Sequence, residues 1–132
     1  MPSIFSRIVA GEIPSFKVAE DDRFFAFLDI NPLVEGHTLV IPKKEVDRIW
    51  DLDDETYRDL FMFAKDVSSA IESCIACDRV GVAVIGLEVP HAHIHLVPIN
   101  RMKDIDFTQP KMKLESARMA EIASMISSHF RK

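Results

Sequence analysis

The sequence predicts a single α+β domain in which an antiparallel sheet of about five strands is packed by one long helix. Five short apolar segments bounded by turn residues are typical of strands. One long stretch after Asp53 repeats apolar residues at helical spacing. The last two strand-like segments are joined too closely for a parallel crossover, so they are expected to pair antiparallel. A chain of 132 residues, 48% of them hydrophobic, is long enough to form one domain with its own core.

The first third of the chain predicts a short helix, a hairpin and a third strand. Gly11 is suited to end the helix, and Pro14 prevents the helix from resuming. Asp21 and Asp22 supply the turn of the hairpin. The expected bounds are a helix within 3–14, strands at 16–21 and 23–30, a loop at 31–36 and a strand at 37–42.

The rest of the chain predicts two helices with two strands between them. Asp53 is expected to cap the long helix, and Phe63 lies off its apolar stripe, which leaves apolar surface for a partner. Strands are expected at 79–86 and 88–99, and a last helix at about 114–130. The inward stripes are Tyr57, Leu60, Phe61, Ala64, Val67 and Ile71 in the long helix, and Met119, Ile122, Ala123 and Ile126 in the last.

Three of the five histidines occupy alternate positions of the stretch EVPHAHIHLVP, residues 88–98. In a strand, His91, His93 and His95 would share one face at a spacing of about 7 Å, with apolar residues on the other face. A single histidine in such a place is ordinarily a packed, hydrogen-bonded core residue. Three in register indicate a function, because each buried imidazole needs both a donor and an acceptor satisfied. Two chemistries use such a pattern, namely metal ligation by neutral imidazole and nucleophilic or acid–base catalysis.

Charge, hydropathy and cysteine content argue against several classes of protein. The net charge of -5 disfavours general nucleic-acid binding, which needs clustered cations. The sequence shows neither an apolar run of membrane-spanning length nor a basic leader with an apolar segment, so we expect a cytoplasmic soluble protein. Cys74 and Cys77 fall at the tail of the long helix and are expected to be ordinary small apolar residues. The residues expected to be solvated surface are Lys43, Lys44, Lys111, Lys113 and His129.

The pattern His-x-His-x-His followed by two apolar residues resembles the signature of the histidine triad (HIT) superfamily of nucleotide-binding hydrolases and transferases, in its HINT-like branch. Two further segments stand in that family's order, SIFSRIVAGEIP near the start and FLDINPLVEGHTLVIPKK in the first half. The resemblance covers roughly residues 3–99. It implies a single HIT domain over residues 1–132, with its core at about 3–99 and a C-terminal extension and helix at about 100–132.

The resemblance implies roles for four histidines and one aspartate. His93 would be the nucleophile that attacks the α-phosphorus of a bound nucleotide, and a neutral imidazole suits this role near pH 7. His95 would lie near the phosphate and the leaving group, while His91 and His37 would support the hydrogen bonds that fix the site. Asp29 would accept hydrogen bonds from the two ribose hydroxyls, a task suited to an ionised carboxylate.

The resemblance also implies a nucleotide pocket, and next to it the sequence departs from the family. In many members the loop before the triad is rich in glycine and carries a polar residue that contacts phosphate; here it reads IGLEVPH. Leu87 and Glu88 take the places of those polar residues, and a carboxylate beside a phosphate is repulsive unless it is protonated or turned away. The implied nucleotide-binding residues, besides Asp29, are Phe5, Ile8, Phe27, Ile30, Glu88 and Val89.

A second departure concerns metal. Some members of the family hold a structural zinc with an N-terminal Cys-x-x-Cys, a histidine after the PKK segment and the first triad histidine. This chain has Ser3, Ser6 and Glu45 at three of these positions, and zinc prefers thiolate and imidazole ligands. We therefore expect no metal and no other cofactor.

Together these features predict a nucleotidyl hydrolase or transferase that cleaves the α-phosphate linkage of a purine nucleotide conjugate. The conjugate would be a nucleoside phosphoramidate, a dinucleoside polyphosphate or an adenylylated adduct, and the reaction would pass through a covalent nucleotidyl-His93 intermediate. The resemblance also implies a homodimer. Two other functions stay open: a catalytically weak nucleotide-binding module, and a metal-dependent hydrolase with the triad as ligands. A straight strand is poorly suited to the second, because histidines about 7 Å apart must converge on bonds of about 2.1 Å.

Overall fold

The structure, a computed structural model that describes residues 2–130, contains one open antiparallel sheet with the strand order β1-β2-β3-β5-β4. The strands are β1 (Lys17–Glu20), β2 (Phe24–Leu28), β3 (Thr38–Pro42), β4 (Arg79–Ala83) and β5 (Ile94–Ile99). The helices are α1 (Ile4–Val9), α2 (Asp54–Cys74) and α3 (Ser116–His129), with short 3-10 turns at Ile49–Asp51 and Met102–Ile105. The predicted fold class is confirmed, as is the order of the predicted elements.

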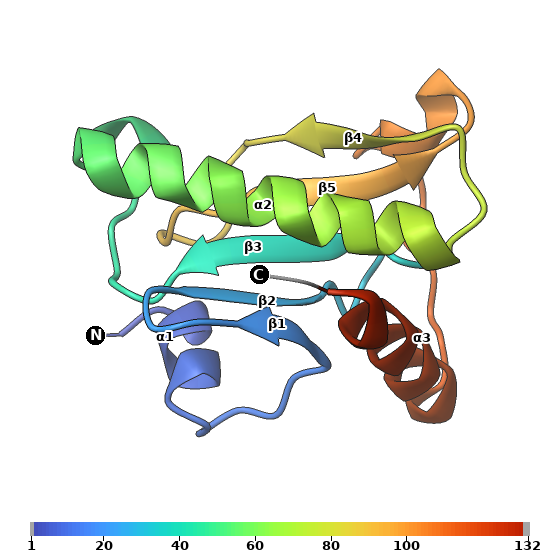
Figure 1. Ribbon diagram of the computed structural model, residues 1–132, viewed down its shortest axis with the longest axis horizontal. Coiled ribbons are helices and arrows are strands. Elements are labelled where there is room, and N and C mark those ends of the chain that lie inside the picture. Colours follow the sequence, from blue (N-terminus) through green and yellow to red (C-terminus); the bar gives the residue numbers. More distant parts are fainter. Residues whose placement is uncertain (1, 131–132) are drawn as a thin grey trace.

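The two faces of the sheet carry separate apolar clusters. Successive side chains of a strand point to opposite faces, so Phe24 and Ala26 of β2 join one cluster while Phe25 and Phe27 join the other. Helices α2 and α3 cover the first face, and Figure 1 shows α2 running along the sheet. Phe5 of α1 packs into the second cluster. This division leaves the second face to form the site described below.

The strand register brings a histidine onto the second face. Phe27 pairs with Leu39, and Leu39 pairs with His95, so these three side chains point the same way. The neighbouring row points toward the helices and consists of buried apolar residues, Ala26, Val40 and Ile94.

Helix α2 is capped and packed as its sequence predicts. The Asp53 carboxylate accepts a hydrogen bond from the Thr56 N–H (3.2 Å), which satisfies a backbone donor of the first turn. Phe63 is the exception: its ring packs between Phe24 and Phe130, so it belongs to the core and leaves no surface for a partner. Among the described residues, no helix combines the length and the apolar character that crossing a bilayer requires.

The strands around the triad are shorter than the sequence predicts. β4 ends at Ala83 instead of reaching residue 86, and β5 begins at Ile94 instead of residue 88. The cause lies in the backbone donors: Pro90 has none, the His91 N–H donates to Val89 O (2.8 Å), and the Ala92 N–H donates to Val46 O (2.7 Å). His91 and His93 therefore precede the sheet, and only His95 lies in a strand. The last helix also starts later than expected, at Ser116.

Candidate active site

A cavity of about 670 Å³ lies on the second face of the sheet, between α1, the end of β2 and the segment that precedes β5. Its lining includes every predicted site residue except His91, namely Phe5, Ile8, Phe27, Asp29, Ile30, His37, Glu88, Val89, His93 and His95. Residues that are distant in the sequence thus converge on one concave site. His91 is fully buried and supports the site from outside the cavity.

The loop before β3 delivers His37 to the site through a glycine turn. Gly36 has a φ of +94°, a conformation that L side chains rarely adopt, and a Cβ there would lie 3.1 Å from Pro98 Cγ. The His37 N–H closes the turn on Val34 O (3.2 Å), and His37 O accepts from the Asp29 N–H (3.0 Å). The backbone therefore holds Asp29, the predicted ribose-binding carboxylate, next to His37.

Hydrogen bonds determine the tautomers of His37 and His95. The Leu33 N–H donates to His37 Nδ1 (3.0 Å), so the ring proton of neutral His37 must lie on Nε2. That Nε2–H donates to His95 Nδ1 (3.0 Å), which leaves the proton of His95 on its own Nε2. Burial lowers the pKa of His37 to about 4 and the pKa of His95 to about 3, so both rings are neutral near pH 7.

His93 has the opposite tautomer. Its Nδ1 donates to the backbone oxygen of His91 (2.7 Å), so in the neutral ring Nε2 carries the free lone pair. The Nε2 atoms of His93 and His95 make no hydrogen bond to the protein. Every fully buried side-chain nitrogen and oxygen within residues 2–130 does have a hydrogen-bond partner, so these two atoms are not fully buried. Because both residues line the cavity, their Nε2 atoms open into it. The His93 and His95 rings have centroids 4.9 Å apart. The site therefore places the lone pair of His93 Nε2 near the N–H donor of His95 Nε2.

Asp29 lies at the side of the cavity next to His37. Its Oδ1 accepts from the Asn31 N–H (2.9 Å), and its Oδ2 lies 3.7 Å from His37 Nε2. Burial raises the pKa of the Asp29 carboxyl, against the hydrogen bond from Asn31, which lowers it. Because Oδ2 accepts no hydrogen bond from the described protein, Asp29 has an oxygen available to accept one from a ligand.

An apolar slot adjoins His93. The Phe5 ring meets the Phe27 ring edge to face, with centroids 5.4 Å apart, and meets the His93 ring in the same way at 5.0 Å. Ile30 is 66% exposed at the rim. Glu88 is also exposed at the rim, where its charge adds to the effect of burial on the pKa of Asp29. The predicted nucleotide-binding residues therefore lie around one cavity together with His93.

Two residues of the C-terminal extension line the cavity although the sequence did not single them out. The Phe107 ring meets the His95 ring (centroids 4.8 Å apart) and the His37 ring (5.9 Å) in edge-to-face geometry. Lys111 is exposed, as predicted, but it also borders the cavity, and its charge lowers the pKa of both Asp29 and His37. The Met112 N–H anchors this segment to Pro32 O (2.8 Å). Neither periodicity nor a motif marks these positions.

The donor atoms of the site do not fit a divalent metal. Asp29, His37 and His95 offer atoms within 4.8 Å of one another, but His37 Nε2 carries a proton that His95 accepts. At the position where the resemblance would place the structural zinc of some family members, the Ser3 hydroxyl lies 2.7 Å from His91 Nδ1, which leaves no space between them for an ion with bonds of about 2 Å to each. The three triad histidines also do not point to a common metal position, because His91 Nε2 donates to Pro42 O (2.7 Å), away from the cavity.

We predict that the purified protein carries no stoichiometric zinc. Neutral hydroxyls and a carboxylate replace the thiolate and imidazole ligands that zinc prefers, and each is engaged in hydrogen bonds. Elemental analysis after dialysis measures the metal content, and about one zinc per chain would show this prediction to be wrong.

We predict that the free energy of unfolding falls as the pH falls from 7.5 to 5. His37 and His95 have pKa values below the ordinary 6.5, so the unfolded chain binds more protons in this window, and acidification favours unfolding. The raised pKa of Asp29 acts in the opposite direction. We expect a net loss of roughly 2–4 kcal/mol, measured by urea unfolding at both pH values. Equal stability at pH 7.5 and pH 5 would contradict neutral buried imidazoles.

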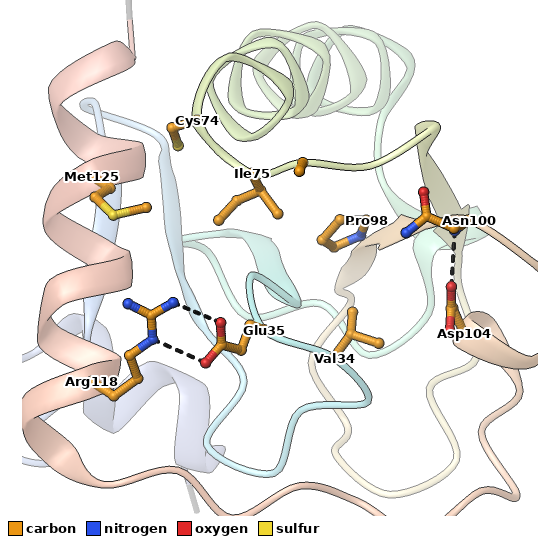
Figure 2. Close-up of a pocket in the computed structure, with 10 residues that line it drawn as sticks. Val34, Glu35, Cys74, Ile75, Pro98, Asn100, Asp104, Arg118 and Met125 are labelled. Atoms are coloured by element: carbon orange, nitrogen blue, oxygen red, sulfur yellow. Dashed lines mark hydrogen bonds and ion pairs between the residues drawn. The ribbon is translucent and has the colours of Figure 1, made fainter.

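A second cavity of about 390 Å³ lies between the end of α2, α3 and the loop before β3, as Figure 2 shows. Arg118 donates from Nε and Nη2 to the two carboxylate oxygens of Glu35, at 2.9 and 2.8 Å. This pair joins α3 to the loop that carries His37. Cys74 borders the same cavity, and burial raises its thiol pKa as it raises that of Cys77, so neither is a thiolate near neutral pH.

Comparison with known proteins identifies the family. The family model described as the HIT domain matches residues 10–102. The chain is 36% identical over 132 residues to an uncharacterized HIT-like protein of Borreliella burgdorferi, covering 94% of this chain and 95% of that one. It is 39% identical over 100 residues to the adenosine 5'-monophosphoramidase of Schizosaccharomyces pombe, covering 74% of each. The structure matches that of a HIT-like protein of Bartonella henselae with a TM-score of 0.85 and 29% identity, covering 97% of this chain and 96% of that one. The chain therefore belongs to the HIT family that its triad indicated.

Proposed function

We propose that the protein is a nucleotidyl hydrolase or transferase that cleaves the α-phosphate linkage of purine nucleotide conjugates through a covalent nucleotidyl-His93 intermediate. The observation that carries the proposal is the pair of opposite tautomers: His93 Nε2 presents a lone pair and His95 Nε2 presents a proton to the same cavity. Membership of the HIT family and the similarity to a yeast adenosine 5'-monophosphoramidase support it.

In the first step, His93 Nε2 forms a bond to the α-phosphorus while the bond from phosphorus to the leaving group breaks. The leaving amine or phosphate departs with any proton it needs taken from water. His95 donates its Nε2–H to a phosphoryl oxygen, and a preorganised donor of this kind is worth roughly 3–4 kcal/mol in the transition state. Water then attacks phosphorus and gives up a proton to the solvent, the bond from phosphorus to His93 Nε2 breaks, and the nucleoside monophosphate leaves with the His93 ring neutral again.

The rest of the cavity would hold the nucleoside. The slot between Phe5 and Phe27 accepts an aromatic base, and Asp29 accepts from the ribose hydroxyls. Glu88 and Lys111 border the cavity with opposite charges. Their charges would affect the choice of leaving group, and the leaving group is what distinguishes a phosphoramidate from a dinucleoside polyphosphate.

The alternative of a binding module with weak turnover rests on the loop before the triad. Leu87 is 89% exposed at the rim, where many family members would carry a polar residue that contacts phosphate. The chemistry of His93 does not depend on that contact, so we favour the enzyme.

A panel of adenosine and guanosine phosphoramidates and dinucleoside polyphosphates, assayed side by side in excess chelator, tests the proposal. We expect turnover of at least one AMP conjugate without added metal. Nucleotide binding without turnover of any conjugate would favour the binding module. Activity that disappears with chelator and returns with a divalent ion would favour a metal-dependent hydrolase.

The protein is also proposed to form a homodimer. β4 is an edge strand of the sheet, so one row of its backbone donors and acceptors is unpaired within the described chain. Apolar side chains on and after it are exposed: Val82 is 56%, Val84 39% and Ile85 44% exposed. A second copy can add its own edge strand there. Light scattering at micromolar concentration is expected to give twice the chain mass. The Val82→Glu variant is expected to give a lower mass, because the added charge disfavours pairing of the two edge strands. A monomeric wild-type protein would contradict the proposal.

A further inference from the structure

We infer that Ser3, Ser6 and Glu45 are positioning residues for the reaction: together they form a hydrogen-bonded brace that fixes His91 and, through it, the nucleophile. The inference rests on the role proposed for His93. We call these three side chains the Ser–Glu brace.

The brace joins the start of α1 to the segment after β3. Glu45 Oε1 accepts from the Ser3 N–H (2.7 Å) and from the Ser6 hydroxyl (2.7 Å). Ser3 Oγ in turn accepts from the Ser6 N–H (3.0 Å), as an N-cap does. These bonds lower the pKa of the Glu45 carboxyl, so it remains an acceptor at neutral pH.

The brace ends on His91, and the protons determine the direction of that contact. A neutral imidazole carries one ring proton, and His91 gives it from Nε2 to Pro42 O (2.7 Å). Nδ1 is therefore an acceptor, and the Ser3 hydroxyl, 2.7 Å away, must donate to it. Ser3 is 6% exposed and His91 is 0% exposed, so water does not compete for this bond. Both ring nitrogens of His91 are thus held, each by a different segment of the chain.

The next link reaches the nucleophile. The backbone oxygen of His91 accepts the Nδ1–H of His93 (2.7 Å), and this bond leaves the lone pair of His93 on the side of the cavity. Residues 91–93 lie before β5, so sheet pairing does not hold that oxygen in place. Fixing the His91 ring at both nitrogens supplies the constraint that strand pairing would otherwise provide.

The same helix start also lines the substrate cavity. Phe5, between the two serines, packs against both His91 (centroids 5.9 Å apart) and His93 (5.0 Å). The Ser–Glu brace therefore sets the position of the apolar slot relative to the nucleophile, and this relative position decides whether a bound α-phosphorus faces Nε2.

The experiment compares Ser3→Ala, Ser3→Thr and Ser6→Ala, with Ser73→Ala on the surface of α2 as the matched control. Ser3→Ala removes the donor to His91, and we expect kcat for an AMP phosphoramidate to fall roughly ten- to hundredfold, with KM and AMP affinity within about twofold. Ser3→Thr keeps a hydroxyl and is expected to restore most of kcat. Ser6→Ala keeps the Ser3–His91 contact and is expected to have the smaller effect.

Nitrogen-15 NMR of the histidine rings provides a readout that a merely structural role would not change. The wild-type spectrum is expected to show His91 protonated on Nε2 and His93 protonated on Nδ1, and Ser3→Ala is expected to give mixed tautomers at one or both. Wild-type kcat in a folded Ser3→Ala protein, a loss of kcat that threonine does not restore, or unchanged tautomers would overturn the inference. If the wild-type protein turns over no substrate, the proposed function fails, while the spectra still test the brace. If Ser3→Ala does not fold, Ser6→Ala decides the question, because it removes one bond of the brace to Glu45. A partial fall in kcat together with a detectable second tautomer at His91 or His93 supports the inference, and wild-type kcat with wild-type tautomers overturns it.

Discussion

Replacing His93 with alanine is expected to abolish turnover of an AMP phosphoramidate while AMP affinity stays within roughly tenfold, about 1.4 kcal/mol. The substitution removes the only free imidazole lone pair that opens into the cavity among the described residues. It leaves Asp29 and most of the apolar slot in place, and under the proposed function these contacts would hold the nucleotide equally in the ground and transition states. The effect therefore falls on kcat.

The matched control for this variant is His129→Ala. His129 is exposed at the end of α3 and makes only local hydrogen bonds, as the sequence predicted. We expect it to retain wild-type kcat and KM, measured beside His93→Ala with a titration of AMP. A His93→Ala protein that retains full activity, or one that loses AMP binding and turnover in equal proportion, would contradict the assignment of His93 as nucleophile.

Replacing Asp29 with asparagine is expected to weaken AMP binding by roughly ten- to hundredfold while kcat at saturation changes little. Asparagine retains the Oδ1 bond to the Asn31 N–H, so the turn at this position is preserved. It loses the charge and one acceptor, and a hydrogen bond to a charged group is worth about 1.5–3 kcal/mol. Because the proposed ribose contact would be made both before and during the reaction, we expect the loss to appear in KM.

Asp22→Asn, in the exposed hairpin turn, is the control for the loss of one negative charge. Calorimetric titration with AMP and steady-state kinetics measure both variants. If Asp29→Asn binds AMP as the wild type does, Asp29 does not contact the ribose. If Asp29→Asn lowers kcat and leaves KM unchanged, Asp29 stabilises the transition state and does not only bind the nucleotide.

The sequence was sufficient to predict the parts of the fold that follow from local periodicity. Alternation in β2 and the helical stripe of α2 each carry a repeated signal, and both elements lie where that signal puts them. The break between β4 and β5 was missed, because it depends on where the backbone donors of His91 and Ala92 find acceptors, and Val46 is distant in the sequence. Phe63 was misplaced for a similar reason, since α3 brings Phe130 to its side.

For the site, the motif predicted which residues gather in the cavity but not the arrangement of their protons. The tautomers of His37 and His95 depend on the Leu33 N–H, and that of His93 on the His91 carbonyl. A pattern of residue types does not predict which backbone N–H or C=O group will meet a given side chain. Phe107 and Lys111 were missed because the extension that carries them has neither periodicity nor a motif, and only the folded chain brings it over His37.

Trapping the intermediate tests the central claim most directly. A substrate labelled in its nucleoside is mixed with the wild-type enzyme and quenched rapidly without acid, and the protein is digested and analysed by mass spectrometry. We predict that the label is on His93, through a bond that acid breaks and base leaves intact, as expected of a phosphorus–nitrogen bond. Turnover with no labelled protein at any quench time, or a label on another residue through an acid-stable bond, would contradict the covalent mechanism.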